Sequence, residues 1–170
     1  MVLAESDVRH WRRSGLAALW LSALVIACDQ WTKWLVVGAL VPHQPVAVAP
    51  LINLTLTYNS GAAFSLLSQA SGWQRWFFAA VAGIVSVVIV YWLRRTPGEE
   101  RLTASSLALI LGGAVANAYD RVMLGHVIDF IDVYVNDWHW PAFNVADSAI
   151  TVGAVLLIID TIRGGGRHRP

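Results

Sequence analysis

Four long apolar stretches constrain this chain more than any other feature of its sequence. They lie at about residues 16–37, 73–93, 102–119 and 143–162, and each approaches the roughly 20 residues that a helix needs to cross a bilayer. Of the 170 residues, 56% are hydrophobic and only 14% are charged, a composition that does not suit a soluble domain. The sequence therefore predicts an all-α polytopic membrane protein, with four transmembrane helices in a single domain spanning residues 1–170.

Positive charges lie on one side of the apolar stretches. Arginines precede the first stretch, separate the second from the third, and follow the fourth. By contrast, residues 38–72 contain no Lys, Arg, Asp or Glu, and residues 120–142 contain one Arg with four Asp. Lys and Arg near a span are retained in the cytoplasm. We therefore expect both termini to be cytoplasmic, and 38–72 and 120–142 to be outside loops.

Both outside loops contain runs with β-strand character. Residues 51–58 mix β-branched, aromatic and polar side chains and end at the turn signal Asn59-Ser60-Gly61. Residues 127–138 form a second such run, with a turn signal at Asn136-Asp137. We expect the two runs to form a small extracytoplasmic β-sheet, or cradle, that rests on the membrane.

Polar side chains occur within or beside the apolar stretches, where a charge costs at least ~2.5 kcal/mol. Counting along each helix at about 1.5 Å per residue puts them near the outer ends of the spans, and the outside loops can supply others to the same layer. The converging residues are Asp29, Lys33, Asn59, Asn117, Asp120, Arg121, Asp129, Asn144 and Asp147. This convergence predicts a functional site at the outer surface of the bilayer.

Simpler structural roles compete at some of these positions. Asp29 and Lys33 are one helical turn apart, in the order that suits an ion pair along a helix. Asp120 and Arg121 fit the end of a helix at the membrane interface. Asp147 is different, because it lies within an apolar run with no cation nearby in the sequence.

Five ordered segments resemble lipoprotein signal peptidase, also called signal peptidase II. The segments are Asp29-Gln30-Trp31-Thr32-Lys33, Tyr58-Asn59-Ser60-Gly61-Ala62-Ala63-Phe64-Ser65, Gly112-Gly113-Ala114-Val115-Ala116-Asn117-Ala118-Tyr119-Asp120-Arg121, Gly125-His126-Val127-Ile128-Asp129-Phe130 and Phe143-Asn144-Val145-Ala146-Asp147-Ser148. The resemblance implies an aspartyl endopeptidase whose catalytic pair is Asp129 and Asp147. It implies supporting or substrate-binding roles for Asp29, Lys33, Asn59, Gly61, Asn117, Asp120, Arg121 and Asn144. Ala116 departs from the glycine expected in the third segment.

The resemblance also implies a substrate and a location. Members of the family remove the signal peptide of a prolipoprotein by cleaving before a cysteine that carries diacylglycerol. The implied location is the bacterial inner membrane, with the site at the periplasmic face and without a metal or cofactor. The expected partners are the prolipoprotein and membrane lipid. No nucleic-acid partner is expected, because the basic residues form small clusters at membrane boundaries. We expect a monomer.

Peptide hydrolysis by two carboxylates requires them to lie close enough to share one proton. Asp129 belongs to an outside loop and Asp147 to a helix, so the loop must fold back onto that helix. Such a pair titrates as a unit, and the sequence leaves open which residue is protonated. The segment 58–65, which contains a glycine and other small residues, is a candidate flap over the cleft.

Two other functions remain alternatives. A metal-dependent membrane hydrolase would use His126, Asp129, Asp132, His139 and Asp147 as ligands, although their spacing lacks a strong signature such as H-E-x-x-H. A small proton or cation transporter would use the same intramembrane charges. Its polar residues should follow a path across the membrane, whereas here they gather near the outer side.

Overall fold

The computed structural model of the chain describes residues 14–61 and 72–164. Within these residues, four helices are long and apolar enough to cross a membrane, as predicted. The helices are α2 (Leu19–Ala39), which continues from the 3-10 helix η1 (Gly15–Ala18), α3 (Trp73–Arg95), α4 (Arg101–Met123) and α5 (Val145–Gly164). Helical structure satisfies every interior backbone N–H and C=O group within its own segment, which a lipid environment requires.

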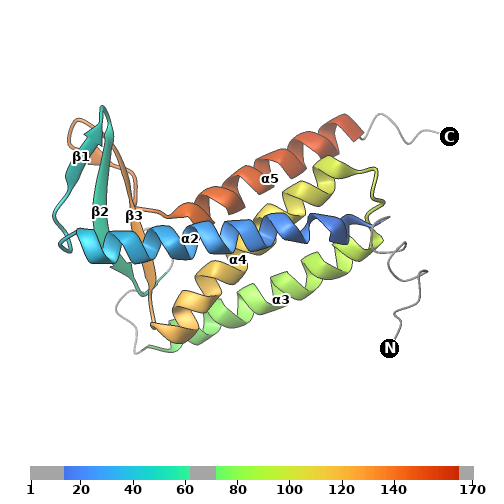
Figure 1. Cartoon of the computed structure of the whole chain (residues 1–170), viewed down its shortest axis with the longest axis horizontal. Helices are drawn as coiled ribbons and strands as arrows, with labels where there is room; N and C mark the ends of the chain where they lie inside the picture. Colours follow the sequence, from blue (N-terminus) through green and yellow to red (C-terminus); the bar gives the residue numbers. More distant parts are fainter. Residues whose placement is uncertain (1–13, 62–71, 165–170) are drawn as a thin grey trace.

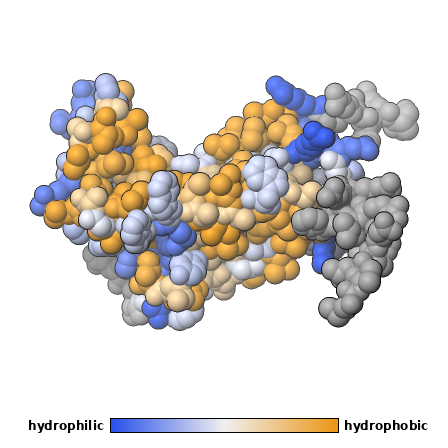
Figure 2. All heavy atoms as spheres, in the orientation of Figure 1, coloured by the Kyte–Doolittle hydropathy of each residue, from blue (hydrophilic) through white to orange (hydrophobic). Residues whose placement is uncertain are grey.

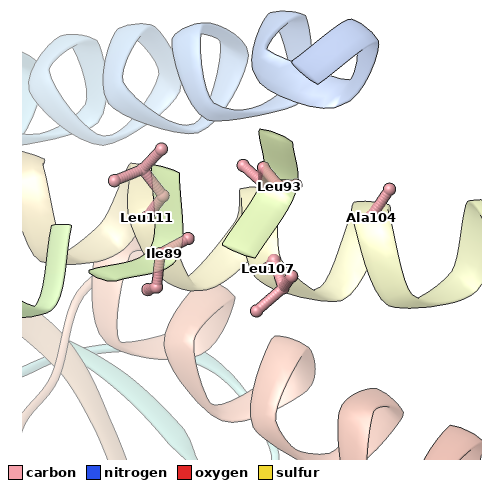
Figure 3. Packing of buried hydrophobic residues seen from close by; sticks show 5 residues of the cluster. All are labelled: Ile89, Leu93, Ala104, Leu107 and Leu111. Carbon is pink, nitrogen blue, oxygen red and sulfur yellow. The ribbon is translucent and has the colours of Figure 1, made fainter. Parts of the chain in front are cut away.

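The central helix of the bundle is α4, which contacts α2, α3 and α5. It is also far more buried than the other three helices. Against α3, the contact is a compact apolar cluster in which Ile89 and Leu93 pack on Ala104, Leu107 and Leu111 of α4 (Figure 3). Dispersion contacts of this kind drive helix association where lipid is as apolar as the side chains themselves.

Close approach of α4 and α5 depends on Gly113. A Cβ at this position would lie 2.3 Å from the backbone oxygen of Ala146 and 2.7 Å from Cγ1 of Ile150. Neither distance is sterically possible, so any side chain at Gly113 must push the first turn of α5 away from α4. Small residues at such a crossing let two backbones approach closely inside a membrane.

We expect Gly113→Ala to lower the free energy of unfolding by about 3 kcal/mol, the upper range for overpacking a tight contact. Gly83→Ala is the matched control, because a Cβ at Gly83 meets nothing within 4 Å. The control should be neutral or slightly stabilising, since alanine favours helix. Thermal unfolding in detergent micelles measures both. Equal melting temperatures for the two variants would contradict the close contact.

The outside loops form an antiparallel sheet, so the predicted all-α class is not fully correct. In the described part of the chain the sheet has the order β1-β2-β3-β4. Its strands are β1 (Val46–Ala49), β2 (Ile52–Asn59), β3 (Val127–Val135) and β4 (Trp138–His139). The predicted pairing of residues 51–58 with 127–138 is confirmed, with Asn53 opposite Asp132 and Thr57 opposite Asp129. The sequence did not predict β1, which is short and fully exposed.

The sheet stands at one end of the helices, beside the end of α2 and the start of α5 (Figure 1). The beginning of α2 and the end of α5 lie at the opposite end (Figure 1). Apolar residues cover most of the visible side of the helical region, and hydrophilic residues gather toward its ends (Figure 2). This distribution is the one that a multi-pass membrane protein needs.

Candidate active site

Asp129 lies on β3, and β3 is hydrogen-bonded to Phe143, two residues before the start of α5. The backbone N–H groups of Phe130 and Ile131 donate to the carbonyl of Phe143 at 3.0 and 2.8 Å, and the N–H of Phe143 returns a bond to the carbonyl of Ile131 at 3.0 Å. Asp147 follows in the first turn of α5. The predicted folding back of the loop onto the helix is therefore present, with Asp129 on a strand.

Asn144 connects the two carboxylates. Its Nδ2 donates to Oδ1 of Asp129 at 2.7 Å. Its Oδ1 accepts a bond from the backbone N–H of Asp147 at 2.9 Å, and its own backbone N–H donates to Oδ2 of Asp147 at 3.3 Å. This reciprocal pattern is a capping box at the start of α5. One buried side chain therefore caps the helix and holds Asp129 beside it.

Two further asparagines complete the hydrogen bonding of the carboxylates. Nδ2 of Asn59, at the end of β2, donates to Oδ2 of Asp129 at 3.0 Å. Nδ2 of Asn117, on α4, donates to Oδ1 of Asp147 at 2.8 Å. Each of the four carboxylate oxygens thus accepts a hydrogen bond, which fixes the orientation of both groups.

A buried ion cluster lies beside Asn117. Nζ of Lys33 is 2.7 Å from Oδ2 of Asp29 and 2.6 Å from Oδ2 of Asp120, and all three side chains are almost inaccessible. Lys33 therefore pairs with both aspartates, whereas the sequence suggested only the ion pair within α2. Gln30 also belongs to the cluster, because its Nε2 donates to Oδ1 of Asp120 at 2.8 Å. Gln30 was not among the predicted site residues, although a polar side chain within an apolar helix was a signal for it.

The ion cluster determines how Asn117 is oriented. Nζ of Lys33 donates to Oδ1 of Asn117 at 3.1 Å, and an ammonium group can only donate. Asn117 must therefore turn its carbonyl oxygen to Lys33 and its amino group to Asp147. Asp29 acts on α5 as well, because its Oδ1 accepts the backbone N–H of Ala146 at 2.8 Å. The cluster thus positions the first turn of α5 and the side chain that holds Asp147.

Arg121 extends from α4 toward the end of β2. Its Nη2 donates to the carbonyl of Gly61 at 3.3 Å, and its guanidinium lies 5.2 Å from the ring centre of Phe78. The N–H of Gly61 in turn donates to Oδ1 of Asn59 at 3.1 Å. Arg121 therefore supports the asparagine that contacts Asp129. The predicted flap continues beyond Gly61 into residues 62–65, which lie outside the described residues.

The two carboxylates line an open groove of about 1240 Å³. Its walls come from the sheet, the segment before α5 and the first two turns of α5, and Figure 2 shows the molecule hollowed between the sheet and α5. The lining residues include Asn59, Asn117, Arg121, Asp129 and Asp147. Asp29, Lys33, Asp120 and Asn144 are buried behind this surface. The predicted residues thus form one layer that lines the groove and a supporting layer behind it.

Burial raises the pKa of Asp129 from 3.8 to about 6, and the negative charge of Asp147 adds to the rise. Hydrogen bonds from Asn59 and Asn144 and the charge of Lys33 act in the opposite direction. Desolvation disfavours the charged form of a carboxyl group, which explains the sign. Asp129 can therefore hold a proton at a pH at which an ordinary aspartate is fully ionised.

The raised pKa predicts how stability depends on pH. Because the native pKa exceeds the unfolded value of 3.8, the stabilising contribution of Asp129 is fully present below pH 3.8 and is lost as pH rises through about 6. The loss amounts to about 3 kcal/mol. In detergent, the wild type should therefore lose more stability between pH 4 and 7 than Asp129→Asn. Parallel pH profiles of the unfolding free energy would contradict the shift.

The metal-dependent alternative finds little support in the described residues. Among residues 14–61 and 72–164, no group of three or more His, Cys, Asp or Glu side chains is placed to hold a metal ion. His139 pairs with Asp132, and His126 packs edge-on against Tyr58. Far from the sheet, the hydroxyl of Thr103 on α4 donates a hydrogen bond to Oδ2 of Asp160 on α5.

Four helices of membrane-spanning length in the described residues, with a groove lined by two carboxylates at one end, define the class as a multi-pass membrane protein. The family model described as signal peptidase (SPase) II matches residues 21–163. The chain therefore belongs to the signal peptidase II family and is a peptidase.

Proteins of similar sequence align with this chain over almost its full length. A protein named lipoprotein signal peptidase from Alteromonas mediterranea is 52% identical over 160 residues, covering 94% of this chain and 88% of its own length. One of the same name from Acinetobacter baumannii is 54% identical over 158 residues, covering 93% of this chain and 90% of its own. A solved structure described as a bacterial membrane enzyme superposes with a TM-score of 0.79 at 28% identity, covering 90% of this chain and 92% of its own.

Proposed function

We propose that the chain is an aspartyl endopeptidase that removes the signal peptide of prolipoproteins, cleaving before a cysteine that carries diacylglycerol. The observation that carries this proposal is the arrangement of Asp129 and Asp147. Both face one groove, and Asn144 hydrogen-bonds to both, although they come from a strand and a helix. Membership of the signal peptidase II family supports the choice of substrate.

In the proposed mechanism the two carboxyl groups share one proton. The ionised carboxylate acts as general base on a water molecule, and the protonated one donates a hydrogen bond to the scissile carbonyl. The raised pKa of Asp129, about 6, supports a protonated partner at a pH at which an ordinary aspartate has lost its proton. Asn59, Asn117 and Asn144 hold the pair in place, and Arg121 lies in the groove as a donor toward the substrate backbone.

The proposed topology is one integral-membrane domain over residues 1–170, with both termini in the cytoplasm and the sheet at the periplasmic face of the inner membrane. The ends of the helices support it. Arg94 and Arg95 end α3 and Arg101 begins α4, at the end of the bundle away from the sheet. Lys and Arg beside spans remain cytoplasmic, so the opposite end faces the periplasm.

The groove suits a substrate that is anchored in lipid. One wall reaches Thr151 and Val152 of α5, which are exposed on a membrane-length helix. The acyl chains and the apolar signal peptide can therefore remain in the bilayer while the scissile bond meets water at the carboxylates. When the substrate is anchored in the bilayer, the scissile bond is already held near the carboxylates. The entropic cost of reaching a reactive geometry is therefore lower.

The test is a gel-shift cleavage assay with the purified chain in detergent. The substrates are a diacylglyceryl-modified prolipoprotein and the same protein without the modification. We expect cleavage of the modified form before the cysteine and much slower cleavage of the unmodified form. Activity should survive exhaustive chelation. Activity that is lost on chelation and restored by zinc would favour the metal-dependent alternative, and equal cleavage of both substrates would contradict the role of the lipid.

A further inference from the structure

The groove continues past the two carboxylates onto the sheet. Toward the membrane it is lined by Ser148, Thr151 and Val152 of α5, and over the sheet by residues of β2, β3 and β4. The sheet half contains the side chains of His43, Thr55, Thr57, Asp132 and His139. The groove therefore has a membrane half and a sheet half, with Asp129 and Asp147 between them.

Asp132 is the acidic group of the sheet half. It is only 6% exposed, yet it lines the groove. Nδ2 of Asn53 donates to its Oδ2 at 3.0 Å, and Nδ1 of His139 lies 2.8 Å from its Oδ1. The ring of His139 stacks on Tyr134, with the ring centres 5.4 Å apart. Asn53 and Tyr134 therefore hold the Asp132–His139 pair in place, and neither Asp132 nor His139 has a part in the proposed reaction.

The chemistry of the pair favours hydrogen-bond donors. In the neutral tautomer of His139 that donates Nδ1–H to Asp132, the other ring nitrogen, Nε2, is an acceptor. The carboxylate keeps a negative charge with room for another donor, since its two oxygens offer about four acceptor positions. An ammonium or hydroxyl side chain in the sheet half would gain hydrogen bonds. A carboxylate side chain there would be repelled by Asp132.

The direction of the substrate follows from its two chemically different parts, and this step rests on the proposed function. The signal peptide is apolar and remains in lipid, so it follows the membrane half along α5. The mature part is soluble and must leave over the sheet half. Asp132 lies three residues beyond Asp129 on β3, about 10 Å along the strand. An extended chain covers that distance in two or three residues.

We propose that Asp132, oriented by His139 and Asn53, is a specificity-determining residue of this peptidase. It contacts the side chains of the second and third residues of the mature lipoprotein, in which the lipidated cysteine is the first residue. Basic or hydroxyl side chains are favoured at these positions and acidic ones are disfavoured. This inference rests on three observations: the groove, the Asp132–His139 pair within it, and the spacing of Asp132 from Asp129 along β3.

The test uses three diacylglyceryl-modified prolipoproteins that differ only at these two positions, carrying Lys-Lys, Ser-Ser or Asp-Asp. For the wild type in detergent we expect kcat/KM to be about tenfold higher for Lys-Lys than for Asp-Asp, as one charged hydrogen bond would give. Asp132→Asn should bring this ratio close to one. Asp137→Asn is the matched control, because Asp137 is an exposed aspartate in the turn of the same hairpin. It should keep the wild-type ratio.

A second variant protects the test against misfolding of Asp132→Asn. His139→Phe keeps an aromatic ring against Tyr134 and removes the Nδ1 donor, but Asn53 still holds the carboxylate of Asp132, so the ratio should stay the same or rise. A wild-type ratio near one, an unchanged ratio in Asp132→Asn, or a ratio near one in His139→Phe would overturn the inference. If Ser-Ser is cleaved in those cases, the proposed function stands. If the wild type cleaves none of the three substrates, the result would contradict the proposed function itself.

Discussion

Asp147→Asn is expected to reduce kcat for prolipoprotein cleavage by at least about 10³-fold, with little change in KM, and Asp129→Asn is expected to do the same. General acid–base catalysis by a positioned carboxyl group contributes about 10²–10⁴-fold, and the proposed reaction loses both roles when either partner becomes an amide. An amide can neither accept a proton from water nor share one with its neighbour. Single-turnover cleavage of the modified substrate in detergent measures the effect.

The folded state of these variants needs a separate measurement. Each carboxylate oxygen of Asp129 and Asp147 accepts a hydrogen bond from an N–H donor. An Asn side chain at either position would place its own NH₂ group against one of these N–H donors. We expect a loss of about 1–3 kcal/mol in stability, which thermal unfolding would detect and which is too small to explain the loss of activity in a folded sample. Asp137→Asn serves as the control with full activity. Undiminished cleavage by either active-site variant would refute the dyad.

Lys33→Met is expected to have the largest effect on stability, about 3–5 kcal/mol. Methionine keeps most of the side-chain volume but removes the cation from between Asp29 and Asp120, whose carboxylates lie 2.7 and 2.6 Å from Nζ of Lys33. Two buried like charges then face each other without compensation. We expect a strongly lowered melting temperature in detergent, and a poor yield of folded protein.

Neutralising the whole cluster should recover much of this loss. In the triple variant Lys33→Met, Asp29→Asn, Asp120→Asn no charge remains in the cluster, and replacing an entire buried ion cluster is often nearly neutral. Activity should recover less than stability, because Lys33 orients Asn117 toward Asp147. A melting temperature of Lys33→Met equal to that of the wild type would show that the cluster contributes no stability.

Much of the architecture could be predicted from the sequence, for a simple physical reason. A membrane span needs a long apolar segment whose backbone bonds are local, so length and composition reveal it without knowledge of the rest of the fold. The strands were harder to predict than the helices. Residues 51–58 and 127–138 showed β-character, whereas β1 is short and exposed and depends on pairing with β2 for its structure. The all-α class was therefore only partly right.

The sequence by itself indicated which polar residues of the helices lie toward the same end of the spans, because the depth of a residue follows from its position along a helix. Only the tertiary structure decided their partners: Lys33 between Asp29 and Asp120, and Asn144 between Asp129 and Asp147. Hydrogen bonds depend on distances of about 3 Å between segments far apart in the chain. The register of β3 against β2 and Phe143 sets those distances, and sequence spacing does not.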